Sequence, residues 1–204
     1  MKRKIVSWIL IMLGVAVMSI PLYWKYVGNK RSQQMLEEFQ RTIDEKQHEK
    51  EDYGKKIPET VVDEENAAIL SKEEVIGLIE IKSLDLKYPI VEGTGRNELS
   101  LGIGHIPDTA EIGKNGNCVL AGHRGSRYGA YFKYLNRLSI GDEIKLTDKE
   151  GNLYLYEVVD MKVVGAYDNS VKNQGEEREI TLLTCENSGT MRLIVICAWK
   201  GVEE

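Results

Sequence analysis

Three residues of this chain have side chains suited to acyl transfer: Cys185, His123 and Arg192. Cys185 ends the segment TLLTC, His123 follows the apolar run VLAG, and Arg192 precedes the apolar run LIVICAW. A thiol at a strand end is held by the sheet and remains open to a substrate, while an imidazole can take or return its proton. A nearby guanidinium can lower the thiol pKa or hydrogen-bond an oxyanion. The three residues therefore predict a cysteine nucleophile served by a histidine and an arginine.

Each of these residues also has a structural alternative. A lone cysteine in a strand is usually a buried, inert thiol. Polar residues follow Cys185 directly, which favours a position at the rim, where the next backbone N–H and Arg192 can both face an oxyanion. For the histidine, His48 lies in a charged segment and His105 is expected in a loop between strands. His123 is favoured because it ends an apolar run.

The two other cysteines, Cys118 and Cys197, lie within apolar runs, where core packing is the default. A disulfide between them is left open, since spacing alone does not decide it. No pair of Cys or His residues has the spacing of metal ligands, so no metal or other cofactor is predicted. Loop acids such as Asp108 and Glu111 leave Ca²⁺ as an option, without an EF-hand pattern.

The first segment, residues 1–28, is expected to be a cytoplasmic basic tip followed by a transmembrane signal anchor. Lys2, Arg3 and Lys4 precede 20 uncharged residues, 5–24, a length that suits a helix crossing the roughly 30 Å hydrocarbon core. This run is longer than the apolar part of a cleaved signal peptide and ends in Tyr23 and Trp24, which suit an interface. By the positive-inside rule, the rest of the chain is expected outside the plasma membrane.

The second segment, residues 29–74, is highly charged and is expected to be a partly helical stalk. Its apolar residues Met35, Leu36, Phe39 and Ile43 form a short helical stripe, too short to favour a coiled coil.

The whole chain has 204 residues and a formal net charge of −5. No dense basic patch with interleaved aromatic residues occurs, so no nucleic-acid partner is expected.

The third segment, residues 75–204, has the texture of a mainly β domain. Short β-type runs are broken by Gly, Asn and Asp, which is typical of a barrel or sandwich. The turn DKEGN at 148–152 indicates a hairpin. Apolar residues between His123 and Ile140 suggest one short helix. The expected strands lie at 76–81, 84–90, 117–121, 143–146, 153–164, 179–184 and 191–199.

These motifs resemble the sortases, which are membrane-anchored cysteine transpeptidases of Gram-positive bacteria. AGHRG at 121–125 and TLLTC at 181–185, which matches the TLxTC of the family, carry the resemblance together with Arg192 on the following strand. The order His, Cys, Arg also matches, and the similarity extends over about 76–199. The resemblance implies a closed eight-stranded β-barrel with one or two short helices.

The resemblance also implies a reaction. The thiolate of Cys185 would attack the Thr carbonyl of an LPxTG-like sorting signal on a surface protein and form a thioacyl enzyme. An amine, expected on a peptidoglycan precursor, would then resolve it. His123 would be the proton donor and acceptor, and Arg192 would stabilise the substrate and oxyanion. Thr184, next to the nucleophile, is a candidate for substrate binding.

Within the family, GHIPDTA and AGHRGSRYGAYF favour class D, and class A stays open. The Asp-Pro-aromatic lid motif typical of pilin-polymerising sortases is absent from the sequence. Papain-like peptidases place Cys before His, and the SxGC pattern of L,D-transpeptidases does not occur. The alternative from another class is a noncatalytic exported β-domain that binds a surface protein.

Overall fold

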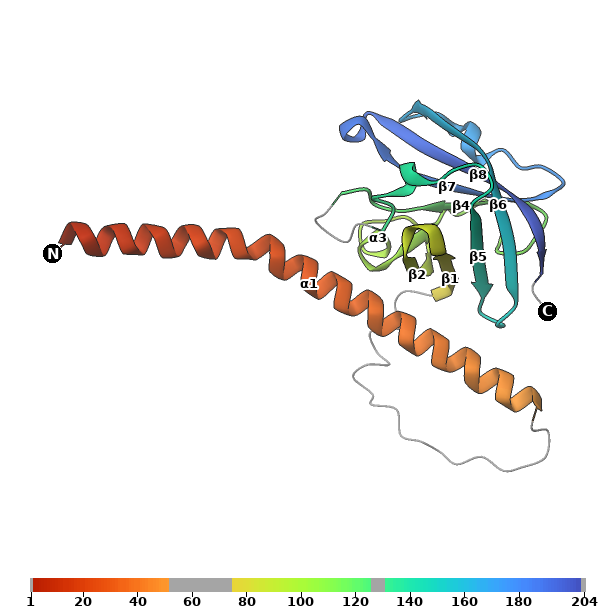
Figure 1. Ribbon diagram of the computed structural model, residues 1–204, viewed down its shortest axis with the longest axis horizontal. Coiled ribbons are helices and arrows are strands. Elements are labelled where there is room, and N and C mark those ends of the chain that lie inside the picture. The colour runs from red at the N-terminus through yellow and green to blue at the C-terminus, as the bar shows by residue number, and fades with distance from the viewer. Residues whose placement is uncertain (1, 52–74, 126–130, 203–204) are drawn as a thin grey trace.

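A computed structural model describes residues 2–51, 75–125 and 131–202 of the chain. Its eight strands close into a barrel in the order β1-β2-β3-β4-β7-β8-β6-β5 (Figure 1). The mainly β fold and the eight-stranded barrel are thus confirmed. The strands are β1 Val75–Ile81, β2 Leu86–Glu92, β3 Ile103–His105, β4 Gly116–Ala121, β5 Glu143–Asp148, β6 Leu153–Gly165, β7 Arg178–Glu186 and β8 Met191–Val202.

Strands β4 and β7 are adjacent and parallel, whereas β7 pairs with β8 in the antiparallel sense. Parallel neighbours need a long crossover connection. Here that connection contains the β5–β6 hairpin, which occupies the other side of the barrel. Consequently the carboxyl ends of β4 and β7 lie at the same edge, and the chain after each strand emerges there.

The barrel interior is filled by alternate side chains of the strands and by the segment that follows the His123 loop. Tyr131, Phe132 and Leu135 of that segment are fully buried. The short helix predicted between His123 and Ile140 is a single 3₁₀ turn, η2 Leu135–Arg137, and residues 126–130 of that prediction lie outside the described residues. The segment is therefore anchored by its aromatic side chains more than by helical structure.

His105 was expected in a loop, and this was wrong. It ends the short strand β3 and is only 4% exposed. Its Nδ1 lies 2.9 Å from Glu92 Oε2, and its Nε2 lies 3.0 Å from Thr109 Oγ1 and 3.1 Å from the Ala110 carbonyl oxygen. Because both ring nitrogens are engaged in this buried network, His105 has a structural role. The three-residue strand is too short to show a sequence periodicity.

Several short helical elements connect the strands. The 3₁₀ turns η1 Lys82–Leu84, η3 Asn169–Lys172 and η4 Asn187–Gly189 follow β1, β6 and β7, and the helix α3 Glu98–Leu101 lies between β2 and β3. Two successive residues of η4, Asn187 and Ser188, have positive φ angles of 46° and 54°. The connection between β7 and β8 is consequently a tight turn in an uncommon backbone conformation.

The N-terminal part of the chain is one helix, α1 Lys2–Glu51, which crosses the boundary expected at residue 28 without interruption (Figure 1). Part of its apolar stripe lies against the barrel. Met35, Leu36 and Ile43 are buried, and Met35 packs with Val91 and Leu101 of the barrel. Near its end, Lys46 Nζ donates to the Lys149 carbonyl at 3.1 Å. The second half of α1 is therefore docked on the barrel.

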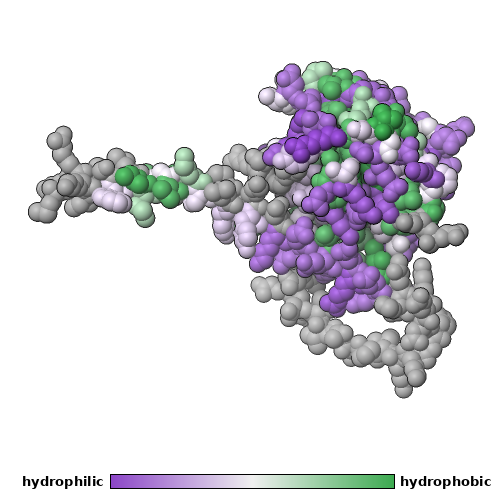
Figure 2. All heavy atoms as spheres, in the orientation of Figure 1, coloured by the Kyte–Doolittle hydropathy of each residue, from purple (hydrophilic) through white to green (hydrophobic). Residues whose placement is uncertain are grey.

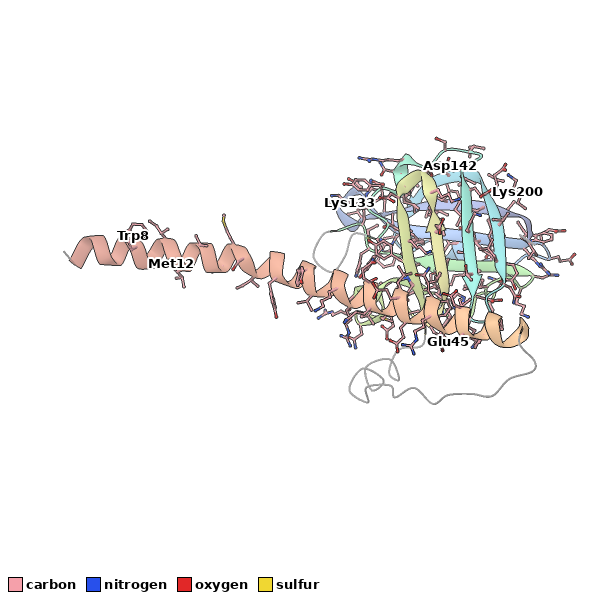
Figure 3. The ribbon with its side chains drawn as sticks, turned by 60° about the horizontal axis from the view of Figure 1, so that its bottom comes forward. Trp8, Met12, Glu45, Lys133, Asp142 and Lys200 are labelled. Carbon is pink, nitrogen blue, oxygen red and sulfur yellow. The ribbon has the colours of Figure 1, made fainter. Side chains whose placement is uncertain are left out.

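The first half of α1 projects away from the barrel (Figure 3). Trp8 and Met12 are labelled on this half, and their side chains are 68% and 66% exposed. Figure 2 shows apolar side chains on this projecting half, whereas the visible face of the barrel is largely hydrophilic. Within the described part of the chain, no helix reaches both the length and the apolarity that crossing a membrane requires.

Cys118 and Cys197 are free and buried. The strand registers pair each of them with Ile180, Cys118 from β4 and Cys197 from β8, so one strand separates them. Two strand spacings are about 9.5 Å, which exceeds the Cα separation of about 7 Å that a disulfide can bridge. The pairing left open by the sequence is thus excluded in this fold.

Candidate active site

His123, Cys185 and Arg192 lie in a row across the adjacent strands β4, β7 and β8. The last pair of the parallel β4–β7 ladder is Ala121 with Leu183, and His123 and Cys185 each follow two residues after it. In the antiparallel ladder, Cys185 is the direct partner of Arg192. Residues opposite each other in such a ladder project to the same face of the sheet. The strand registers thus place Arg192 opposite Cys185 and lead the chain that carries His123 to the same edge of the barrel.

Cys185 is the exposed cysteine of the chain, in contrast to the two buried ones. Burial and the charge of Glu92 raise the pKa of the Cys118 thiol to about 12, and burial likewise raises the pKa of Cys197. Both buried thiols therefore stay protonated at neutral pH and out of reach of a peptide. Since a thiolate is the reactive form, Cys185 is the candidate nucleophile.

The side chain of His123 is partly buried, and this burial lowers its pKa. The imidazole is consequently neutral at pH 7 and able to accept a proton. Its backbone is held on both sides. The Gly122 N–H donates to the Leu183 carbonyl at 3.0 Å, and the His123 carbonyl accepts from the Phe132 N–H at 3.0 Å. Because Phe132 belongs to the core, the histidine is tied to a rigid part of the barrel.

Thr184 was a candidate for substrate binding, but its side chain faces inward. It is 1% exposed, and its hydroxyl donates to the Gly122 carbonyl at 2.7 Å. Side chains alternate along a strand, so a threonine directly before an exposed Cys185 must point into the barrel. The hydroxyl links β7 to the residue before His123. This contact corresponds to a positioning role.

Arg192 is held by the turn that precedes it. One guanidinium nitrogen, Nη1, donates to the carbonyls of Gly189 and Met191, each at 2.9 Å. A guanidinium has five N–H donors, so two bonds from one nitrogen leave capacity for a further acceptor. The turn residue Gly189 has φ of 92°, a conformation that favours glycine. The turn therefore orients the arginine beside Cys185.

Two further residues at this edge were not identified from the sequence. Arg124 follows His123, Glu186 follows Cys185, and the two side chains form a salt bridge between Nη1 and Oε2. The same Nη1 also makes a long contact of 3.5 Å to the Cys185 carbonyl. The signal available in the sequence was an opposite charge directly after each of the two candidate residues. Their pairing follows only once β4 and β7 are known to be neighbours.

Metal ligation is not apparent at this edge. Throughout residues 2–51, 75–125 and 131–202, no three His, Cys, Asp or Glu side chains gather as a metal site would require. Asp108 and Glu111, the loop acids considered for Ca²⁺, are exposed.

This arrangement can be compared with known proteins. The sortase domain family matches residues 79–200, more than half of the chain, and this stretch holds the whole row of His123, Cys185 and Arg192. The chain belongs to the sortase family. Sortases are cysteine transpeptidases, so this sortase is an enzyme that uses a cysteine to exchange one amide bond for another.

Individual relatives agree with this assignment. The sortase is 32% identical to Sortase A of Bacillus anthracis over 183 residues, covering 89% of this chain and 86% of that protein. It is 36% identical to Sortase D of Bacillus subtilis (strain 168) over 110 residues, 53% of each chain. The solved structure of the Sortase D5 transpeptidase of Clostridium perfringens matches with a TM-score of 0.65 and 30% identity, over 84% of this chain and 99% of that one.

Proposed function

We propose that this sortase is a membrane-anchored enzyme that cleaves an LPxTG-like sorting signal after Thr and transfers the acyl group to an amine. The observation that carries the proposal is the row of His123, Cys185 and Arg192 on three adjacent strands. The similarity to both Sortase D and the Sortase D5 transpeptidase supports class D as the subclass. The acceptor amine is proposed to belong to a peptidoglycan precursor.

In the first half of the reaction, His123 takes the proton of the Cys185 thiol, and the sulfur attacks the carbonyl carbon of the Thr residue. The carbonyl oxygen becomes an oxyanion, to which the guanidinium of Arg192 donates. Protonated His123 then gives its proton to the departing amine nitrogen as the C–N bond breaks. The products are a thioester on Cys185 and a free peptide that begins after Thr.

The second half reverses these roles. An incoming amine attacks the thioester carbon and passes its proton to His123. The C–S bond breaks, the sulfur regains a proton, and a new amide is released. A neutral imidazole is the starting form in each half, which agrees with the lowered pKa of His123. No additional cofactor is needed for the balance of atoms.

Membrane anchoring is proposed for the projecting half of α1. The uncharged run 5–24 lies within this helix, and 20 helical residues span about 30 Å, the thickness of a hydrocarbon core. Several of its large apolar side chains, among them Trp8, Met12 and Met18, are exposed. Residues 1–28 would anchor the chain with the N-terminus in the cytoplasm, and residues 75–204 would be the extracellular catalytic domain, joined to the anchor by residues 29–74.

The anchoring proposal is tested by fractionating cells that express the full chain. We expect the protein in the membrane fraction after washing with high salt and alkaline carbonate. Replacing Val15 and Val17 with Asp should move it to the supernatant, because charges at the centre of a membrane-spanning helix cost several kcal/mol. An unmodified chain that is extracted by alkali would reject the anchor.

The catalytic proposal is tested with the full-length protein in detergent and a quenched LPxTG-type peptide. We expect cleavage, an acyl adduct on Cys185 by mass spectrometry, and transfer to an added amine. Cys185→Ala should abolish all three, whereas Cys118→Ala, which removes a buried thiol, should retain them. Cleavage by Cys185→Ala would overturn the proposal. Binding of the peptide without any cleavage by the unmodified enzyme would instead favour the noncatalytic alternative.

A further inference from the structure

The ion pair between Arg124 and Glu186 joins the two strand ends that carry the proposed acid–base and nucleophile. Arg124 directly follows His123, and Glu186 directly follows Cys185. Both side chains are 27% exposed, so the pair is mostly shielded from solvent. A shielded pair with charge-assisted hydrogen bonding holds its geometry better than the average surface pair.

The ion pair lies just beyond the end of the ladder between β4 and β7. The ladder between β4 and β7 ends at Ala121 and Leu183, and the last backbone bond runs from the Gly122 N–H to the Leu183 carbonyl. His123 and Cys185 lie beyond it. Their relative placement therefore depends on side chains, with Thr184 bonded to Gly122 before them and the ion pair after them.

The same two side chains extend to the turn that holds Arg192. Glu186 Oε1 accepts from the Asn187 N–H at 3.2 Å, while Oε2 faces Arg124. Arg124 Nη1 also contacts the Cys185 carbonyl at 3.5 Å. The pair thus connects the histidine segment, the backbone of the cysteine and the start of the β7–β8 turn.

We propose that Arg124 and Glu186 are positioning residues that fix the separation of His123 and Cys185 and cancel each other's charge beside the thiol. This inference rests on the proposed catalytic roles of those two residues. Neither Arg124 nor Glu186 touches the reacting atoms. Misplacing two reacting groups by about 1 Å can slow a reaction by as much as about 100-fold.

Cancellation of charge gives the proposal a specific signature. Among the residues that the structure describes at this edge, the charged groups near Cys185 are Arg124, Glu186 and Arg192, and His123 is the neighbouring titratable group. Removing the arginine leaves a carboxylate that disfavours a thiolate, and removing the glutamate leaves a cation that favours it. The two changes should shift the thiol titration in opposite directions, by about half a pH unit each at this partial exposure.

The titration is measured as the pH dependence of alkylation of Cys185 by iodoacetamide, using the full-length protein. The other two cysteines are buried, so the exposed thiol is labelled selectively. We expect a higher midpoint for Arg124→Gln and a lower one for Glu186→Gln. The double variant should return close to the unmodified value. As a matched control, Glu157→Gln breaks an ion pair with Lys200 elsewhere on the barrel and should leave the midpoint unchanged.

Peptide cleavage by the same variants reports on positioning. We expect each single variant to lower kcat about tenfold with little change in KM. The kcat of the double variant should be no lower than that of the less active single variant, because the two residues act as a unit. Unchanged alkylation midpoints in both single variants would overturn the proposal, as would additive losses of kcat. The alkylation result needs no substrate, so it decides the role of the pair even if Cys185→Ala rejects the proposed function.

Discussion

Cys185 and Arg192 are direct cross-strand partners in the antiparallel ladder of β7 and β8. Directly opposed residues have Cβ atoms about 5 Å apart and share a face of the sheet. The two side chains therefore start side by side on one face, and the guanidinium is held at the η4 turn by the Gly189 and Met191 carbonyls. The arginine needs only a change of side-chain rotamer to reach an acyl oxygen bound at the thiol.

Arg192→Lys is expected to lower kcat about 100-fold or more while the fold stays intact. Lysine keeps the charge but lacks the planar fork that can bond the turn carbonyls and an oxyanion together. Kinetics on a sorting peptide and thermal unfolding measure the two effects. Arg178→Lys is the control, since Arg178 lies on the neighbouring strand β7 and its guanidinium stacks over the Trp199 ring. Near-normal kcat in Arg192→Lys would contradict the proposed role.

Thr184→Val is expected to destabilise the fold by about 1–3 kcal/mol, because it leaves the buried Gly122 carbonyl without its 2.7 Å donor. Activity should also fall, since the residue next to His123 loses an anchor. Chemical denaturation and peptide cleavage check both effects. Thr184→Ser retains the hydroxyl and should lose less of each. Equal stability of the Val and Ser variants would show that the hydrogen bond contributes nothing.

The lowered pKa of His123 predicts a pH effect on stability. The folded chain binds this proton less tightly than the unfolded chain, so the free energy of unfolding rises with pH between the folded pKa and the ordinary value of about 6.5. Acidification from pH 7 to pH 5 should therefore cost the unmodified protein more stability than His123→Gln. Denaturant midpoints across this range measure the difference. Parallel losses in the two proteins would contradict the effect of burial.

The three cysteines predict a simple thiol titration. In the folded protein we expect one fast-reacting thiol, Cys185, and after denaturation all three. The reagent DTNB counts the reactive thiols in the folded protein and in the denatured protein. Reducing agent should not change the melting temperature, because Cys118 and Cys197 are free. A single reactive thiol after denaturation under non-reducing conditions would reveal a disulfide that this fold does not accommodate.

Docking of α1 is tested by Leu36→Asp. Leu36 is buried next to Met35, which packs on the barrel, and losing the burial of a leucine side chain costs about 2–3 kcal/mol before the added charge is counted. We expect the docked half of the helix to release and trypsin to cleave faster at nearby basic residues such as Arg41. Gln34→Asp, at an exposed position of the same helix, is the matched control. Equal cleavage of the two variants would argue against docking.

The sequence predicted the candidate site well where a residue able to do chemistry stands at the end of an apolar strand. Apolar runs ending at His123 and Cys185 predicted two strand ends, and Arg192 at the start of a third run completed the row that the strand registers assemble. Alternation along TLLTC also contained the orientation of Thr184, because exposure of Cys185 requires its neighbour to face inward.

Other features could not be predicted because they depend on contacts distant in the chain. Arg124 and Glu186 are partners only because β4 and β7 are adjacent and parallel. Strand β3 and helix α3 have three and four residues, too few for any periodic pattern to show. The stripe of Met35 and Leu36 predicted a helical face, but a pattern on one helix does not say which surface will cover it.

Helix α1 has a mechanical consequence. Between the last residue of the uncharged run, Trp24, and the buried Ser32 there is a distance of only about 12 Å along the helix axis. This interval contains no break in the helix and therefore no hinge. A tilt or rotation of the helix in this interval is therefore passed on to the barrel, because the second half of α1 is docked on it. A change in the tilt of the docked half of α1 therefore also changes the direction in which the edge with Cys185 faces.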